Sequence, residues 1–535
     1  MLNHIQISHV LYLQPKINIC RESCDIVIKW ECQGFVEHFN VQKFCDDEML
    51  GDQLRTEEPY LRIESPDPTK YYHVEVHAWN SSEGFTFTIA SEKLRICEEI
   101  DKDVLLDESR PLRKGYMVYE GYLGGASQKL EKVAIKLLMG GNEEKLHKEI
   151  DNNQKLLSHR NTVLYRKSGK VVGIGHSVYI VVELCDTDTL YELVLNKTLE
   201  MDRKDVLKQI TQGLCHIHGN EIAHRDLKPQ NILLSQDKKN MKIADFGLSK
   251  EIIPNKSKFS KSGREIGTDG WGSPEHYKGN TMSYKSDIYS AGLVFYFILS
   301  DGKHVFGDKE YLWKPRIIDN ADPLLSGIMG LDAELAKDLI KKMISFKADS
   351  RLTGNEVLLH PYFWTSNKKL DFLNEVKKYL YPFILNKKSD AIGEHIIERI
   401  RKDSKLFINF NTGNGKLGWL STIRQNRSYM TPEALFELGY IAKGGFRGIR
   451  YDHSCPIHLI RFIRNIDEHF QENMNLATML KSREAVWELF YDLFPELFCV
   501  VYNSLSDGMN SAARAVPLVQ FPTELQKYFL IELCT

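Results

Sequence analysis

Two short stretches decide the fold of the central part of this chain: His224-Arg225-Asp226-Leu227-Lys228-Pro229-Gln230-Asn231 and, fourteen residues after its last residue, Asp245-Phe246-Gly247. An apolar-periodic segment precedes the first stretch and predicts a helix. Its apolar positions are Val206, Ile210, Leu214 and Ile217. Ile232-Leu233-Leu234 follows as a predicted strand. A carboxylate, a lysine and an amide therefore share one short loop between regular elements, and a second carboxylate lies on the next loop.

These residue types fit phosphoryl transfer. Asp226 can orient an attacking hydroxyl and accept its proton, and Lys228 can reach the transferred phosphate. Asn231 and Asp245 supply the hard oxygen ligands that Mg²⁺ requires. A chance hydrophilic loop would not explain both the spacing and the flanks. The pattern resembles the catalytic and metal-binding loops of protein kinases, which implies a bilobal α+β kinase fold over about residues 105–364 that binds ATP or ADP with Mg²⁺.

The expected nucleotide site continues upstream. Lys136 ends the sequence Val133-Ala134-Ile135-Lys136, which resembles the third-strand lysine motif of kinases and would pair with the α- and β-phosphates. Glu149 is the candidate carboxylate that holds this lysine. Glu143 and Glu144 remain alternatives, and Glu149 as a solvated helix charge is the plainer interpretation.

The hinge and the phosphate-covering loop complete the site. Tyr179 to Cys185 predicts a buried strand, after which backbone groups of Glu183 and Cys185 would bind an adenine. The glycine-rich loop departs from the kinase pattern, because only Gly115 survives of its three glycines. Glycines allow the backbone to approach phosphates closely, so we expect nucleotide binding but slow transfer to other proteins.

The segment from Lys250 to Glu275 carries small hydroxyl residues among lysines and an arginine. The hydroxyl residues are Ser257, Ser260, Ser262 and Thr268. A phosphate placed on such a loop finds cationic partners and can order it. We therefore expect autophosphorylation here, with a solvated loop of ordinary serines as the alternative.

Residues 1–98 predict an all-β module. Tyr72 to Ala78 alternates strictly before a turn at Asn80 to Gly84, and further runs typical of strands begin at Asp25, Tyr60 and Phe85. Together with Trp30, this pattern resembles a fibronectin type III sandwich, which implies an unknown protein partner or ligand; another small β-sandwich is the alternative. Residues 99–108 are acidic and predict a linker.

Composition limits the class of protein. Hydrophobic residues make up 42% and charged residues 27%, which allows large cores and argues against general disorder. A net charge of −2 gives no overall attraction to nucleic acid. Without a signal peptide pattern or an apolar run long enough for a membrane span, we expect a cytoplasmic protein whose ten scattered cysteines are buried thiols.

Residues 365–505 predict an all-α extension that follows the kinase-like region without a flexible spacer, and residues 506–535 form a tail. On a helix, one apolar face covers Leu459 to Phe470, which directs the other side chains away from the core. Arg464, Asn465 and His469 lie within one turn and a half. They can hold a phosphate and move a proton, as RNA cleavage without a metal requires, although a solvated polar face is the plainer alternative.

The whole pattern resembles the kinase-endoribonuclease family of the inositol-requiring stress sensors and RNase L. The resemblance is carried by Gly267 to Trp271, Glu183 to Cys185, His360 to Trp364, and Arg464-Asn465 with His469. It implies an RNA substrate, a homodimer, and a catalytic tyrosine that falls on Tyr451. Two features depart from the family: the segment from Ser421 to Gly448 is long, and Gly418 stands where an acidic residue is expected.

We therefore expect a nucleotide-regulated, dimerisation-activated endoribonuclease with an autophosphorylating serine/threonine kinase domain, which cleaves RNA to a 2′,3′-cyclic phosphate without a metal. A serine/threonine kinase with a helical regulatory tail and a non-catalytic kinase-fold scaffold are the alternatives. RNA cleavage that persists in EDTA separates the first interpretation from both.

Overall fold

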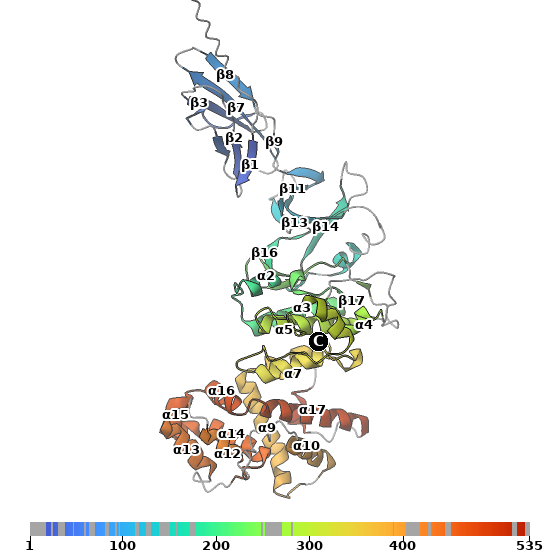
Figure 1. Cartoon of the computed structure of the whole chain (residues 1–535), viewed down its shortest axis with the longest axis vertical. Helices are drawn as coiled ribbons and strands as arrows, with labels where there is room; N and C mark the ends of the chain where they lie inside the picture. Colours follow the sequence, from blue (N-terminus) through green and yellow to red (C-terminus); the bar gives the residue numbers. More distant parts are fainter. Residues whose placement is uncertain are drawn as a thin grey trace, which may run out of the picture. The chain divides into compact units, whose positions relative to one another are not determined.

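The structure is a computed structural model, shown in Figure 1, that forms two compact units. The first contains residues 1–150 and 164–187, and the second contains residues 151–163 and 188–535. The described residues are 18–22, 25–29, 38–45, 48–57, 60–63, 70–80, 85–90, 94–95, 97–112, 117–124, 130–138, 150–156, 158–171, 178–247, 250–251, 270–279, 282–388, 390–402, 418–425, 430–443, 451–515 and 522–529.

The N-terminal region is β-rich. One antiparallel sheet has the order β1 (Asn18–Glu22), β2 (Asp25–Lys29), β6 (Tyr60–Ile63). The second is built on β3 (His38–Cys45), β7 (Tyr71–Asn80) and β8 (Phe85–Ala90). Three short strands extend it: β4 (Glu48–Met49), β5 (Leu54–Thr56) and β9 (Leu94–Arg95).

The alternation in β7 has the predicted effect. Tyr72, Val74 and Val76 are buried, whereas the residues between them are not. The four strands predicted from alternating runs are present as β2, β6, β7 and β8. The sequence analysis missed β3, and Trp30 lies outside the described residues.

A six-stranded antiparallel sheet forms the first half of the kinase-like region. Its order is β10-β11-β12-β13-β15-β14. The strands are β10 (Glu98–Asp101), β11 (Val104–Pro111), β12 (Val118–Leu123), β13 (Glu131–Leu138), β14 (Tyr165–Lys170) and β15 (Val178–Glu183). The linker predicted at residues 99–108 is therefore wrong. Its apolar residues Ile100, Val104 and Leu106 enter the core of the sheet. Of its acidic residues, Asp101 binds Tyr179 and Lys167, and Asp107 is buried and pairs with Arg110.

The second unit begins with a helical layer. Its helices are α2 (Leu190–Leu195), α3 (Arg203–Gly219), α4 (Pro274–Tyr277), α5 (Tyr284–Leu299), α6 (Glu310–Ile318), α7 (Ala333–Met343) and α8 (Gly354–Leu359). The predicted lead-in helix is confirmed as α3, with all four apolar positions buried. The predicted strand after the catalytic loop is confirmed as β18 (Ile232–Ser235), which pairs with β19 (Met241–Ile243).

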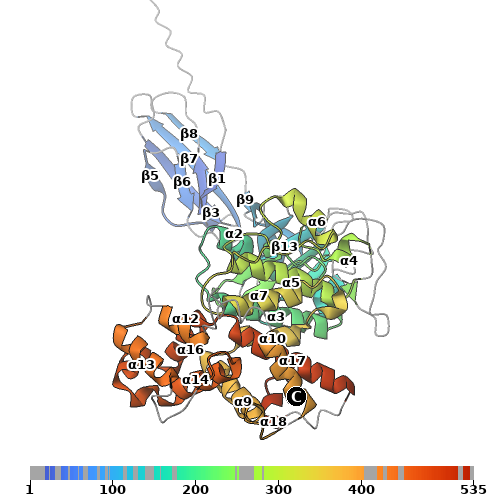
Figure 2. The ribbon, with the colours of Figure 1, turned by 60° about the horizontal axis from the view of Figure 1, so that its bottom comes forward.

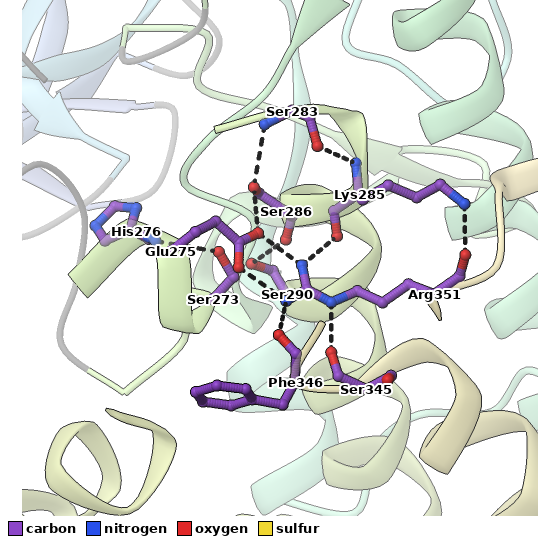
Figure 3. A network of polar contacts seen from close by, with 10 residues as sticks. All are labelled: Ser273, Glu275, His276, Ser283, Lys285, Ser286, Ser290, Ser345, Phe346 and Arg351. Carbon is purple, nitrogen blue, oxygen red and sulfur yellow. Dashed lines mark hydrogen bonds and ion pairs between the residues drawn. The ribbon is translucent and has the colours of Figure 1, made fainter. Parts of the chain in front are cut away.

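A buried ion pair fixes the start of α4 against α5. Figure 3 shows the Arg351 guanidinium bound in bidentate fashion to Glu275, at 2.6 and 2.8 Å. Ser286 Oγ donates to the same carboxylate at 2.6 Å, and Arg351 Nε donates to the Ser345 carbonyl at 2.7 Å. Although burial opposes ionisation of Glu275, the arginine holds the pKa of this carboxyl below its ordinary value.

The C-terminal region is helical, as predicted. It contains α9 (Ser366–Ile384), α10 (Ala391–Lys402), α12 (Trp419–Gln425), α13 (Pro432–Ala442), α14 (Pro456–His469), α15 (Met474–Leu480), α16 (Arg483–Leu493), α17 (Leu497–Ala515) and α18 (Thr523–Gln526). Helix α9 is central and packs against α10, α14, α16 and α18, as the views in Figures 1 and 2 show. Helix α17 continues ten residues past the predicted boundary at Leu505. Within the described ranges, no helix has both the length and the apolar composition needed to cross a membrane.

The kinase-like region and the extension join without a spacer. Helix α9 begins two residues after Trp364, whose ring contacts Phe372, Phe498 and Tyr528. Lys369 of α9 donates to Asp332, next to α7, at 2.6 Å, and both side chains are only 1% exposed. Burial lowers the pKa of Lys369 to about 8, opposed by Asp332. These contacts bind α9 to the kinase-like region as one packed body.

Replacing Asp332 with Asn should destabilise this body by about 3 kcal/mol, because the Lys369 ammonium would stay buried without its counter-charge. Asparagine tolerates the left-handed backbone at this position (φ 67°), so the variant isolates the loss of charge. Glu398→Gln removes the exposed pair with Lys402 and is the control, with no measurable loss of stability expected because solvent screens this pair. Urea denaturation of the full chain measures the stability of both variants. Equal midpoints for the two variants would contradict the role assigned to the buried pair.

Candidate functional site

The buried carboxylate of Asp287 holds the catalytic loop in place. Its oxygens accept the backbone N–H groups of His224 and Arg225, both at 2.8 Å, and contact His218 Nε2 at 2.9 Å. Burial opposes ionisation of Asp287, but these hydrogen bonds and His218 keep its pKa below the ordinary value. The loop is thus fixed through its backbone, which leaves its side chains available for chemistry.

The predicted catalytic residues of this loop lie together. Lys228 Nζ donates to Asp226 Oδ2 at 2.8 Å. Asn231 Nδ2 donates to the Asp226 carbonyl at 2.9 Å and to Asp226 Oδ2 at 3.1 Å. The lysine and the amide give the Asp226 carboxylate a fixed orientation, and its role toward a substrate hydroxyl stays a prediction.

Asn231 and Asp245 fit a divalent metal ion. Ala244 N donates to the Asn231 carbonyl at 2.9 Å, which brings the two loops together. Asn231 Oδ1 is buried and forms no hydrogen bond to any described residue. Such an amide oxygen is a suitable ligand for Mg²⁺, and the Asp245 carboxylate on the adjoining loop adds a charged oxygen. Asp245 itself adopts a left-handed backbone (φ 67°), which turns the chain sharply at this position.

The nucleotide residues of the first unit lie on its six-stranded sheet. Lys136 in β13 lies between Val118 of β12 and Ile180 of β15. Glu183, at the end of β15, accepts the Leu164 N–H with its side chain at 2.7 Å and donates its own N–H to the Leu164 carbonyl at 2.9 Å. Glu183 thereby braces the chain at the predicted hinge, immediately before Cys185.

Six residues named in the sequence analysis lie outside the described residues. They are Gly115, Glu149, Ser257, Ser260, Ser262 and Thr268.

A second cluster lies at the end of α14. Asn465 Nδ2 donates to Tyr451 Oη at 2.5 Å, and Asn465 Oδ1 accepts from Arg464 Nη1 at 3.0 Å. The sequence placed Asn465 on the solvent side of the helix, and that prediction is wrong because its side chain is only 8% exposed. The reason is that Tyr451 packs on Phe462 and the chain that carries it covers this flank of the helix.

His469 and Arg464 are each held by a carboxylate. His469 Nδ1 lies 2.6 Å from Glu472 Oε1, and the His469 side chain remains 24% exposed. Arg464 pairs with Glu468, which also lies 3.9 Å from His469 Nε2. Arg464 Nε is buried and has no hydrogen-bond partner among the described residues. A phosphate placed here would find this nitrogen and could displace Glu468.

Tyr451 keeps its proton at neutral pH. Burial raises the pKa of its hydroxyl, although the hydrogen bond from Asn465 acts in the opposite direction. Because Asn465 donates to the tyrosine oxygen, the Tyr451 O–H hydrogen can point elsewhere. The cluster therefore offers an imidazole, a guanidinium and a hydroxyl donor of fixed position.

Two domain families match the chain. The protein kinase domain matches residues 120–363, and Ribonuclease 2-5A matches residues 424–515. The chain joins a kinase domain to a ribonuclease domain. Relatives of the chain are named serine/threonine-protein kinase/endoribonuclease.

Three relatives are similar to this chain, and two of them carry both activities in their names. "Serine/threonine-protein kinase/endoribonuclease ire-1" of Caenorhabditis elegans is 31% identical over 55% of this chain and 30% of its own length. "Serine/threonine-protein kinase/endoribonuclease IRE2" of Homo sapiens is 37% identical over 38% of this chain and 23% of its own length. "Sensor for unfolded proteins in the ER ire1" of Schizosaccharomyces pombe is 28% identical over 75% of this chain and 37% of its own length. The matched part of the chain thus spans well under half of the length of each of these relatives.

Sequence analysis missed two residues of the ribonuclease domain, Glu468 and Glu472. A detectable signal was present, because Glu468 stands four residues after Arg464 and Glu472 three residues after His469, the spacings at which helical side chains meet. Glu468 contacts the Arg464 guanidinium, and Glu472 contacts the His469 imidazole.

Gly418 of the ribonuclease domain has a steric reason to depart from the family. A Cβ at this position would lie 2.0 Å from the His453 carbonyl oxygen, which also accepts the Trp419 N–H at 2.9 Å. The acidic side chain expected from the resemblance cannot fit this backbone arrangement. The glycine therefore permits the close approach of α12 to the segment after Tyr451.

Replacing Gly418 with Ala should destabilise the chain by about 1–3 kcal/mol, because the backbone of α12 must move away from His453. Gly439→Ala is the matched control: a Cβ there meets no atom within 4 Å, so this change in α13 should be neutral or stabilising. Thermal unfolding followed by circular dichroism compares the two variants. Equal melting temperatures would show that the segment after Tyr451 can move away from an added Cβ without loss of stability, which would contradict the steric role of Gly418.

Proposed function

We propose that the chain is an endoribonuclease whose activity is regulated by nucleotide binding to its kinase domain and by dimerisation. The observation that carries this proposal is the linked set Arg464–Asn465–Tyr451 beside His469, within the segment that matches a ribonuclease family. The relatives named as kinase/endoribonucleases support the same function.

The RNA itself would supply the nucleophile. The 2′-oxygen attacks the adjacent phosphorus, the bond from phosphorus to the 5′-oxygen breaks, and the product ends in a 2′,3′-cyclic phosphate. His469 would take the proton of the 2′-hydroxyl or give one to the leaving 5′-oxygen. Arg464 would hold the phosphate, and the Tyr451 hydroxyl would donate to the charge that develops on it. Asn465 would position Arg464 and Tyr451, because its amide oxygen accepts from the arginine and its amide nitrogen donates to the tyrosine.

The kinase domain would bind ATP or ADP with Mg²⁺. Asn231 and Asp245 would hold the metal, which neutralises phosphate charge when bound. Lys136 would hold the phosphates, and Glu183 and Cys185 would flank the adenine. Asp226 would orient a hydroxyl and accept its proton, and Lys228 would stabilise the transferred phosphate. Autophosphorylation would then proceed on the segment after Asp245.

The half-buried Arg225 of the catalytic loop supports a phosphate-dependent step. Arg225 Nε is enclosed next to the catalytic loop and forms no hydrogen bond to the described residues. A phosphate on the segment between residues 252 and 269 would satisfy this donor and neutralise the arginine. This pairing would order the segment once autophosphorylation has occurred.

The packed junction supports coupling between the two domains. Because α9 is bound to the kinase domain through Lys369 and Asp332, rearrangement of the kinase domain would move the ribonuclease domain as a rigid body. Nucleotide binding would thereby favour a homodimer in which two ribonuclease surfaces pair. The β-rich N-terminal region would act as a fibronectin type III-like module that binds a protein partner or ligand.

Cleavage of a stem-loop RNA tests the proposal. We expect cleavage with and without EDTA, stimulation by ADP, and a product that carries a 2′,3′-cyclic phosphate by mass spectrometry. Phosphotransfer without RNA cleavage would instead favour a kinase with a helical regulatory region. Absence of both reactions would favour a scaffold.

A further inference from the structure

Helix α13 presents two aromatic side chains to solvent. Phe436 is 71% and Tyr440 50% exposed, and the two stand one helical turn apart. Their ring planes are parallel to within 7°, with centroids 6.5 Å apart. Exposed aromatic side chains are usually scattered singly, whereas this pair forms one flat apolar surface. The helix lies in the segment Ser421 to Gly448, which is longer than the family resemblance requires.

The pair borders a groove of about 790 Å³. Its other walls include Met430, Pro432, Leu435 and Lys443. Lys443 follows the last residue of α13 and is exposed, so it adds a positive charge at one end of an otherwise apolar groove. Gly439 also lines the groove, and a Cβ there would meet nothing within 4 Å, so the backbone of α13 is open beside the two aromatic residues.

Helix α13 is anchored to both segments that form the ribonuclease cluster. Glu437, between the two aromatic residues, accepts from Asn473 Nδ2 at 3.0 Å, and Asn473 follows His469 by four residues. At the other end, the Ala442 carbonyl lies 2.9 Å from His453 Nε2, two residues after Tyr451. The aromatic pair is therefore held in a fixed position relative to the end of α14 and to Tyr451.

We infer that Phe436 and Tyr440 form a stacking platform for unpaired bases of the RNA that the ribonuclease domain cleaves; the inference rests on the proposed function. Aromatic faces bind any base by stacking, and a neighbouring lysine attracts the phosphates between bases. A second copy of the chain is the other conceivable occupant of this groove. Among the described residues, only Leu385, Met474 and this pair are large, apolar and exposed in the C-terminal region, too few for an apolar dimer interface. The platform gives this enzyme a preference for single-stranded loops.

The test separates stacking from general apolar contact. The full chain carries His469→Ala to prevent cleavage, and the probe is a hairpin RNA with 2-aminopurine in its loop, whose fluorescence falls when the base stacks. The double variant Phe436→Leu/Tyr440→Leu keeps apolar side chains at both positions but removes the aromatic rings. Leucine is a good helix former, so α13 should be retained. We expect this double change to weaken binding about tenfold or more and to abolish the quenching, and Phe436→Trp/Tyr440→Trp to retain both.

Tyr311→Leu is the matched control, because Tyr311 on α6 of the kinase domain is also 71% exposed and should not affect binding. In the chain with His469 intact, the double leucine variant should raise KM for the hairpin and leave kcat unchanged. Unchanged binding and quenching in that variant would overturn the platform. If instead both leucine and tryptophan variants altered the sedimentation of the chain but not its RNA binding, the face would be a contact between copies. Binding without any cleavage by the parent chain would contradict the proposed function and leave the platform standing.

Discussion

Replacing His469 with alanine should lower the rate of RNA cleavage by at least about 10²-fold, the usual contribution of a general acid or base. The side chain lies at the last residue of α14, is 24% exposed and contacts Glu472. Its loss should therefore leave the fold intact. Single-turnover cleavage of a stem-loop RNA under saturating protein measures the rate free of binding effects.

Two further variants distinguish chemistry from structure. His395→Ala removes an exposed histidine of α10 in the same region and should leave the cleavage rate unchanged. Glu472→Gln keeps the shape but removes the charge that holds His469, and should shift the pH profile of the reaction more than its maximum rate. A His469→Ala chain that cleaves at the parental rate would remove the histidine from the mechanism, whatever the other variants do.

Replacing Asp226 with asparagine should reduce phosphotransfer by about 10²-fold or more while nucleotide-stimulated RNA cleavage persists. The carboxylate is needed to accept a proton, whereas its contacts to Lys228 and Asn231 can be replaced in part by an amide. Nucleotide binding does not require the proton transfer. Intact-mass spectra after incubation with ATP and the RNA assay with ADP measure the two activities on the same protein, after prior dephosphorylation.

Lys136→Ala is the informative partner of this variant, because it should weaken nucleotide binding and so reduce both activities. Asp308→Asn changes an exposed carboxylate of the same domain and should affect neither. Activity should also rise with protein concentration, since dimerisation is bimolecular. A cleavage rate per protomer that stays constant on dilution and does not respond to ADP would mean that the two domains are merely tethered.

Local patterns predicted much of this structure. The loop from His224 to Asn231 was recognisable because phosphoryl transfer requires particular groups at short spacings, and α3 and β18 were recognisable by their periodicity. The same reasoning failed at residues 99–108, where acidic composition suggested a linker. The apolar residues decided the outcome, because Ile100, Val104 and Leu106 enter the core of the six-stranded sheet, and even the acidic Asp107 is buried.

The sequence by itself determined which chemical groups the chain carries and which of them share a loop or a helix. It placed Asp226, Lys228 and Asn231 on one loop and Arg464, Asn465 and His469 on one helix. Contacts between distant segments were decided only by the tertiary structure.

Asn465 became a buried positioning residue because the segment with Tyr451 packs over α14, and Lys369 became a buried ion because α9 docks beside Asp332. Neither side chain is marked by its neighbours in the chain. A polar group on a helix is stable in either place, in water or buried with a partner, and only the packing of another segment selects between them.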